Sequence, residues 1–189
     1  HRTLRQFLSY YQYAGQFLNN QGKYKEAYQA FIKHINLPKN PIFSKEEADS
    51  IFKHNEKDYA TIAYYGALLA FKSKMYDDAL KCTDMALKNK DNINDVYLMK
   101  LGCYLEKKDT ASWVAASKEA IRDVKDNPAF SQNLLYYYTL KDKTNEALQT
   151  ANELVAADSD NKMAYYMLGC VQLNLKKNYE AARAAFEKA

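Results

Sequence analysis

Residues 161–189, which read NKMAYYMLGCVQLNLKKNYEAARAAFEKA, decide the fold. They contain two runs in which apolar residues recur three or four positions apart. The first run has Tyr165, Leu168 and Gly169, and the second has Tyr179, Ala182, Phe186 and Ala189. Such spacing places each run along one face of a helix. Between the runs, residues 175–178 (LKKN) leave room only for a sharp turn. The stretch therefore predicts two antiparallel helices packed against each other.

The second helix of this unit has counterparts along the whole chain, each marked by an alanine in the corresponding place. These alanines are Ala27, Ala79, Ala116, Ala147 and Ala182. The first two are 52 residues apart, and the later gaps are 37, 31 and 35 residues. Five degenerate copies in a nearly constant frame predict one array over residues 1–189. Its repeats lie at about 3–36, 58–91, 93–126, 128–158 and 161–189.

The copies resemble the tetratricopeptide repeat (TPR), a helix–turn–helix unit of about 34 residues. The TPR opening half, large-x-x-Leu-Gly, is matched by Tyr165 to Gly169. The closing half, Tyr-x-x-Ala-x-x-x-Phe-x-x-Ala, is matched by Tyr179 to Ala189. The resemblance implies an all-α fold: an α-solenoid of about five repeats, wound as a right-handed superhelix with a concave groove.

Single copies depart from the pattern in ways that carry structural expectations. In the first copy, Gly15 stands where the partner helix passes closely and where a Cβ would hold the two helices apart. The fourth copy has Leu135 in this place, so we expect its helices to be pushed apart or shifted by one residue. The second and fifth copies each carry one additional residue, which we assign to their turns. In the third copy, the first helix carries Leu98, Leu101, Gly102 and Leu105.

Residues 37–57 interrupt the repeats. Pro38 and Pro41, three residues apart, are incompatible with the interior of a helix. Ser44 and Glu47 then form a capping-box pattern, which predicts a short inserted helix over about residues 45–54. Insertions into repeat arrays usually lie in loops on one face. Two interpretations stay open: a second contact surface, or a packed cap over the end of the groove.

Composition favours helices and argues against two classes of function. The chain has 5 Gly and 3 Pro in 189 residues and no alternating β-branched runs. Its net charge of +4 comes from 27 basic and 23 acidic residues mixed along the chain, so no basic stripe for nucleic acid is present. No apolar run approaches the roughly 20 residues of a membrane span.

The cysteines and the chain ends bear on location and assembly. Cys82, Cys103 and Cys170 are too widely spaced for a CxxC redox or zinc motif, which predicts buried, reduced thiols and favours a soluble, cytoplasmic protein. The sequence starts at His1 instead of Met and ends within a helical pattern. We therefore expect a fragment of a longer protein, and a periplasmic or exported location stays open. The last helix would expose Phe186, which favours a dimer through that helix.

The resemblance to TPR proteins implies that inner positions of the first helices line the groove. Among the 25 inner positions only Glu106 and Lys107 are charged. The final two inner positions of the fifth repeat are Leu173 and Asn174. A carboxylate clamp is not expected, because Gln12 and Gln16 stand where the family's clamp has Lys and Asn. We predict that the groove binds an extended or helical, largely uncharged segment of a partner protein. The candidate contact residues are Gln12, Gln16, Asn19, Ala63, Ala67, Met99, Cys103, Gln132, Tyr136, Tyr166 and Cys170.

The sequence predicts no catalytic residue, cofactor or metal site. His1, His34 and His54 have no acidic or histidine partner at metal-ligand spacing, and Gly15 and Gly22 have the wrong spacing for a phosphate-binding loop. We therefore expect a non-enzymatic interaction module or scaffold whose partner is a protein or peptide. Two alternatives remain. The chain could be a docking or regulatory segment of a larger enzyme, or the groove tyrosines could bind a glycan or small ligand.

Overall fold

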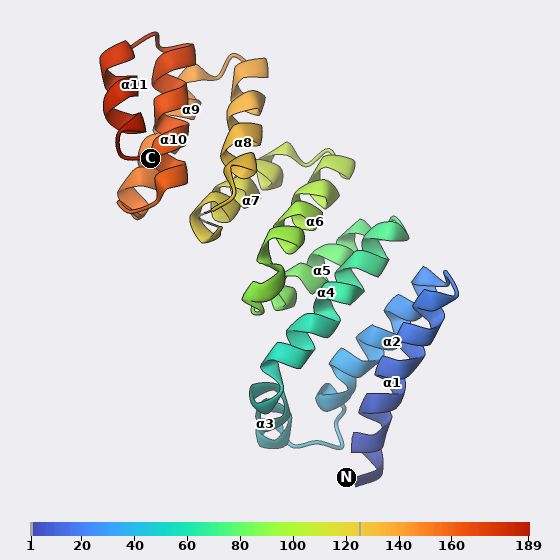
Figure 1. Ribbon diagram of the computed structural model, residues 1–189. Helices are drawn as coiled ribbons and strands as arrows, with labels where there is room; N and C mark the ends of the chain where they lie inside the picture. The colour runs from blue at the N-terminus through green and yellow to red at the C-terminus, as the bar shows by residue number, and fades with distance from the viewer. Residues whose placement is uncertain (1, 125) are drawn as a thin grey trace. The chain divides into compact units, whose positions relative to one another are not determined.

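The computed structural model describes residues 2–124 and 126–189, with side chains from Ser9 onward. Over these residues the secondary structure is helical and contains no β-strand (Figure 1). The predicted all-α class is confirmed, as is the inserted helix α3 (Lys45–His54). Both bonds of its capping box are present, from the Ser44 backbone to the Glu47 carboxylate at 2.8 Å and from the Glu47 backbone to the Ser44 hydroxyl at 3.2 Å.

The chain divides into two compact units, His1–Asp109 and Thr110–Ala189, here called unit 1 and unit 2. The boundary falls in the turn of the third predicted repeat, so the two helices of that repeat belong to different units. Unit 1 contains α1 (Arg2–Asn20), α2 (Tyr24–Asn36), η1 (Leu37–Lys39), α3, α4 (Glu56–Lys72), α5 (Tyr76–Ala86), η2 (Lys90–Asn92) and α6 (Ile93–Glu106). Unit 2 contains α7 (Thr110–Asp123), α8 (Pro128–Leu140), α9 (Thr144–Ala157), α10 (Lys162–Cys170), η3 (Val171–Leu175) and α11 (Tyr179–Phe186).

One type of turn recurs after every first helix. Each turn contains a residue with positive φ, and these residues are Gly22, Lys74, Lys108, Asp142 and Lys177. In the first four turns the next backbone N–H donates to the carbonyl five residues earlier, for example Lys23 to Leu18 at 3.0 Å and Met75 to Ala70 at 2.8 Å. This bond is characteristic of a helix end closed by a left-handed residue. The repeats are therefore helix–turn–helix units of TPR-like type.

The fifth repeat accommodates its additional residue differently from the prediction. We expected the residue in the turn, but η3 (Val171–Leu175) continues α10 as a π-helix. The Lys176 N–H donates to the Val171 carbonyl at 3.1 Å, and the Asn178 N–H donates to the Gln172 carbonyl six residues earlier at 2.9 Å. A π-helical turn holds one residue more than an α-helical turn. The additional residue therefore lies inside the helix.

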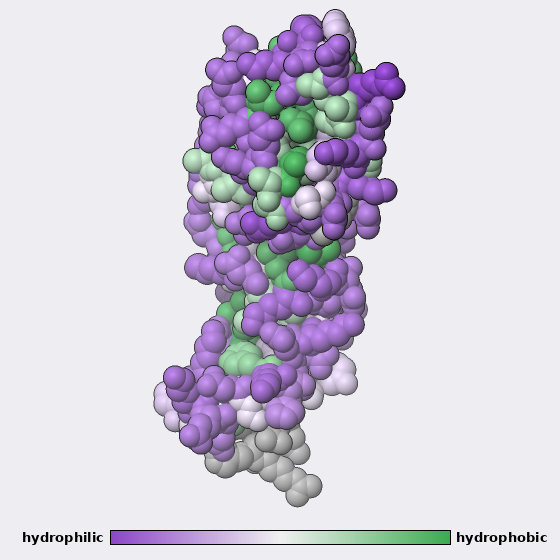
Figure 2. All heavy atoms as spheres, turned by 90° about the vertical axis from the view of Figure 1, so that its left-hand side faces the viewer, coloured by the Kyte–Doolittle hydropathy of each residue, from purple (hydrophilic) through white to green (hydrophobic). Residues whose placement is uncertain are grey.

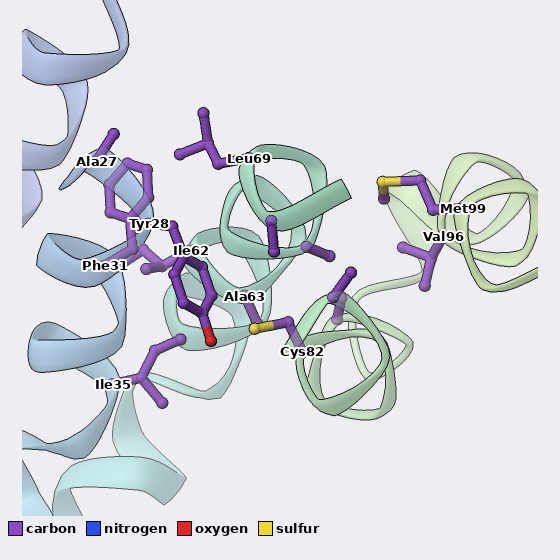
Figure 3. Close-up of a cluster of buried hydrophobic side chains, with 14 of the residues drawn as sticks. Ala27, Tyr28, Phe31, Ile35, Ile62, Ala63, Leu69, Cys82, Val96 and Met99 are labelled. Carbon is purple, nitrogen blue, oxygen red and sulfur yellow. The ribbon is translucent and has the colours of Figure 1, made fainter. Parts of the chain in front are cut away.

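The core of unit 1 is built around α4, against which α2, α5 and α6 pack. In Figure 3, Tyr28 and Phe31 of α2 approach α4 from one side, and Val96 and Met99 of α6 lie on the other. Small residues on α4 let these neighbours come close, because four of its alanines have no exposed surface. They are Ala60, Ala63, Ala67 and Ala70.

Helix α6 buries only part of the apolar residues that mark it as the first helix of the third repeat. Leu101 is buried, whereas Leu98 and Leu105 are 49% and 61% exposed. The buried face instead contains Val96, Tyr97, Met99 and Cys103. Residues on nearly every side of α6 are apolar, so the sequence period alone does not select a face. Packing against α4 and α5 within unit 1 makes the selection.

The helices of the fourth repeat, which carries Leu135, lie further apart than those of the first two repeats. The backbones of α8 and α9 approach each other less closely than those of the α1–α2 and α4–α5 pairs, which carry Gly15 and Gly66 at this place. Leu135 is half-buried, and Leu134 beside it is fully buried in the core of unit 2. The separation has the direction expected for a side chain in place of hydrogen.

Gly15 and Gly66 should respond in opposite ways to replacement by alanine. A Cβ on Gly15 would lie 2.5 Å from the ring of Phe31, which is only 4% exposed and cannot move aside, whereas a Cβ on Gly66 would meet only the Cys82 sulfur at 3.5 Å. We expect Gly15→Ala to lower the free energy of unfolding by about 1–3 kcal/mol through overpacking. Gly66→Ala should raise it by about 0.5–1 kcal/mol, because alanine favours the helix. Urea unfolding of the two variants measures the difference, and equal effects would contradict this account.

Candidate interaction surface

The candidate surface in unit 2 is formed by side chains of α8 and α10. It comprises Gln132, Tyr136 and Leu140, spaced four residues apart on α8, with Tyr166 and Cys170 on α10. We call these five residues the α8–α10 surface. Tyr136 is 65% and Leu140 64% exposed, whereas Tyr166 and Cys170 are half-buried. None of the five side chains is charged at neutral pH.

A hydrogen bond connects two of these residues. The Gln132 side-chain amide donates from Nε2 to the Tyr166 hydroxyl at 3.4 Å. Below them, the Ser131 hydroxyl donates to the Met163 carbonyl at 3.4 Å and joins the same two helices. Burial raises the pKa of the Cys170 thiol, and the nearby Tyr166 hydroxyl opposes this shift only in part. The thiol therefore stays neutral at physiological pH.

Several candidate residues in unit 1 belong to the core instead. Ala63, Ala67 and Cys103 have no exposed surface, and Met99 has 8%. The reason is that α4 and α6 turn these positions toward the neighbouring helices of unit 1. Burial raises the pKa of the Cys103 thiol to about 11, so this group is inert at neutral pH.

The three candidates on α1 remain at the surface. Gln16 is exposed, and Gln12 and Asn19 are half-buried. Beside them lies an aromatic stripe that the sequence interpretation missed: Tyr10, Tyr13 and Phe17 are each more than 60% exposed. Their spacing of three and four residues could have indicated this stripe from the sequence. It gives α1 a second apolar face next to the one through Tyr11 and Leu18.

The side chains at the two charged inner positions, Glu106 and Lys107, both interact with residues of α5. Lys107 forms an ion pair with Asp77, and the Glu106 carboxylate accepts a hydrogen bond from the Tyr76 hydroxyl at 3.3 Å. These groups therefore join α5 to α6 within unit 1. On the face shown in Figure 2, polar and charged side chains dominate, with smaller hydrophobic areas between them.

Metal-binding and membrane-spanning features were not predicted from the sequence. Among residues 2–124 and 126–189, no group of three or more His, Cys, Asp or Glu side chains is placed to hold a metal ion. None of the helices described is both long enough and apolar enough to cross a membrane. The three cysteines are free thiols, two of them buried and Cys170 half-buried.

Comparisons with known proteins add a likeness to solved structures. No protein-family model matches the sequence, and no curated protein matches it. Among solved structures, a crystal structure of MamA is similar, with a TM-score of 0.46 and 12% sequence identity over 92% of this chain and 91% of that chain. The turns and helix pairs described above define this chain as an all-α protein with a TPR-like helical repeat fold.

Proposed function

We propose that this chain is a protein-interaction module and that its α8–α10 surface binds a largely uncharged segment of a partner protein. The main support is the exposure of Tyr136 and Leu140 beside the hydrogen-bonded Gln132–Tyr166 pair. Burying a leucine side chain contributes about 1.5–3 kcal/mol, and tyrosines are frequent among the residues that dominate binding energy. The Gln132 amide supplies polar contacts that suit the neutral backbone of an extended or helical peptide.

A displayed library of random peptides, selected on the purified protein, tests this proposal. We expect enriched peptides with apolar residues and few charges, and a synthetic peptide from this set should bind at one site. Tyr136→Ala combined with Leu140→Ala should weaken binding at least tenfold, because both changes remove apolar area from the contact. Isothermal titration calorimetry measures the affinity.

A charge swap on the second helices provides the matched control. Lys118 on α7 and Glu153 on α9 form an ion pair at 3.0 Å. Exchanging them as Lys118→Glu with Glu153→Lys retains the pair and should leave peptide affinity unchanged. The proposal is wrong if the selected peptides are predominantly acidic or basic, or if the swap weakens binding as much as loss of Tyr136 and Leu140.

A further inference from the structure

A pocket of about 530 Å³ lies in unit 1 beside the inserted helix α3, and α4 and α5 supply its other walls. Its lining combines lysines, carboxylates and apolar side chains. The lining residues are Lys39, Asp49, Phe52, Lys53, Glu56, Tyr59, Met85 and Lys88. Helix α3 has no fully buried residue, and it rests on the core through the partly buried Ile51 and Phe52.

Tyr59 is the buried polar residue of this lining. It is 3% exposed, and within the described part of the chain its hydroxyl has no hydrogen-bond partner. Its ring is held by Phe52 and His34, with ring centroids 4.8 and 5.3 Å away. Burial raises the pKa of Tyr59 to about 12, so the hydroxyl is protonated at neutral pH and can donate a hydrogen bond. Native proteins leave few such groups unsatisfied.

The charges of the lining leave positive groups available. Lys88 is paired with Glu56 at 3.1 Å. Lys39 donates to the neutral side chain of Asn36, also at 3.1 Å. Within residues 2–124 and 126–189, neither Lys39 nor Lys53 forms an ion pair. The Asp49 carboxylate also belongs to the lining, so three lysines face two carboxylates and the lining has a net positive charge. Its two ammonium groups without an ion pair lie next to the apolar surfaces of Phe52 and Met85.

We propose that this pocket binds a small organic anion. Its head group pairs with Lys39 and Lys53, its apolar body packs on Phe52 and Met85, and one of its acceptor atoms receives the Tyr59 hydrogen bond. The volume is typical of sites for small molecules, which combine a mainly apolar lining with a few polar groups. The inserted residues 37–57 thus form one wall of a ligand site. This inference is independent of the α8–α10 surface, which lies in unit 2.

A matched pair of fluorescent probes tests the inference on the intact chain. Anilinonaphthalene sulfonate carries an anionic group on an aromatic body, and phenylnaphthylamine is the same body without the charge. We expect saturable binding of the sulfonate at one site, and weaker binding of the neutral probe by about tenfold or more. Lys39→Gln with Lys53→Gln should reduce sulfonate affinity about tenfold and leave the neutral probe unaffected. Equal affinity of both probes for the parent chain would overturn the inference.

Two further variants distinguish this site from general surface binding. Lys25→Gln with Lys33→Gln removes the same charge from α2 and should not change sulfonate affinity; an equal loss in this variant would refute the site. Tyr59→Phe should weaken the sulfonate at least fivefold. Without probe, it should leave the unfolding midpoint unchanged or higher, because it removes an unpaired buried hydroxyl. A lowered midpoint would mean that the hydroxyl already has a partner, and the inference would fail.

Discussion

Replacing Asn161 with alanine is expected to lower the free energy of unfolding by about 2–4 kcal/mol, since this side chain makes two buried hydrogen bonds at once. Its Oδ1 accepts from the Ala164 backbone at 3.1 Å and caps α10. Its Nδ2 donates to the Ile121 carbonyl of α7 at 3.0 Å. Asn161 is 1% exposed, so no water can replace either partner. Urea unfolding followed by circular dichroism measures the loss.

Asn178 provides the control for this prediction. It caps α11 through the Ala181 backbone at 3.1 Å, but it is exposed and makes no second bond of the kind seen at Asn161. Asn178→Ala should therefore cost only about 1 kcal/mol. Asn161→Asp retains the cap but turns a carboxylate oxygen toward the Ile121 carbonyl in a buried position, so it should cost at least as much as Asn161→Ala. Equal losses at positions 161 and 178 would show that the α7–α10 bond contributes nothing.

The second large effect is a loss of stability at alkaline pH. Burial raises the pKa of Cys82 from 9.0 to about 12, that of Cys103 from 9.0 to about 11, and that of Tyr59 from 10.0 to about 12. Each folded pKa lies above its unfolded value, so the unfolded chain loses these protons first. The stability that these three groups contribute is fully present below pH 9 and is lost as the pH rises toward about 12. A difference of one in a group's pKa between the folded and the unfolded chain corresponds to about 1.4 kcal/mol of stability. The summed loss from the three groups is therefore several kcal/mol.

All three groups lie in unit 1, which identifies where the loss should occur. Urea unfolding at a series of pH values, under reducing conditions, measures the dependence. Cys82→Ala with Cys103→Ala removes two of the titrations, so the stability of this variant should fall less steeply between pH 9 and pH 11. A flat profile for the parent chain over this interval would contradict the burial of the two thiols.

The sequence predicted features whose cause is local. The capping box at Ser44, the end of α3 near His54 and the turn at Gly22 each depend on a few neighbouring residues, and each is present. The asparagine caps were equally local but were missed. Asn127, Asn161 and Asn178 stand directly before helices and bond to backbone N–H groups of the first turn, a position that asparagine strongly favours.

The faces of α4 and α6 could not be predicted, because they depend on helices distant in sequence. Ala63 and Cys103 occupy inner positions of the repeat, yet neighbouring helices in unit 1 bury them completely. Two of the candidate contact residues do lie together, since the packing of α8 against α10 joins Gln132 to Tyr166. No sequence pattern indicated the pocket beside α3, because its walls come from four separate segments.

The π-helical segment η3 also affects how the copies should be aligned. The positive-φ residues Lys74, Lys108 and Asp142 follow one another at intervals of 34, and Lys177 comes 35 residues after Asp142. An alignment that puts the gap in the loop misorients the end of the fifth first helix by about 100°, the rotation per residue. Leu173 lies in this segment and lines a hollow with Tyr179 and Phe186 of α11. Comparisons between copies should therefore place the gap within residues 171–175.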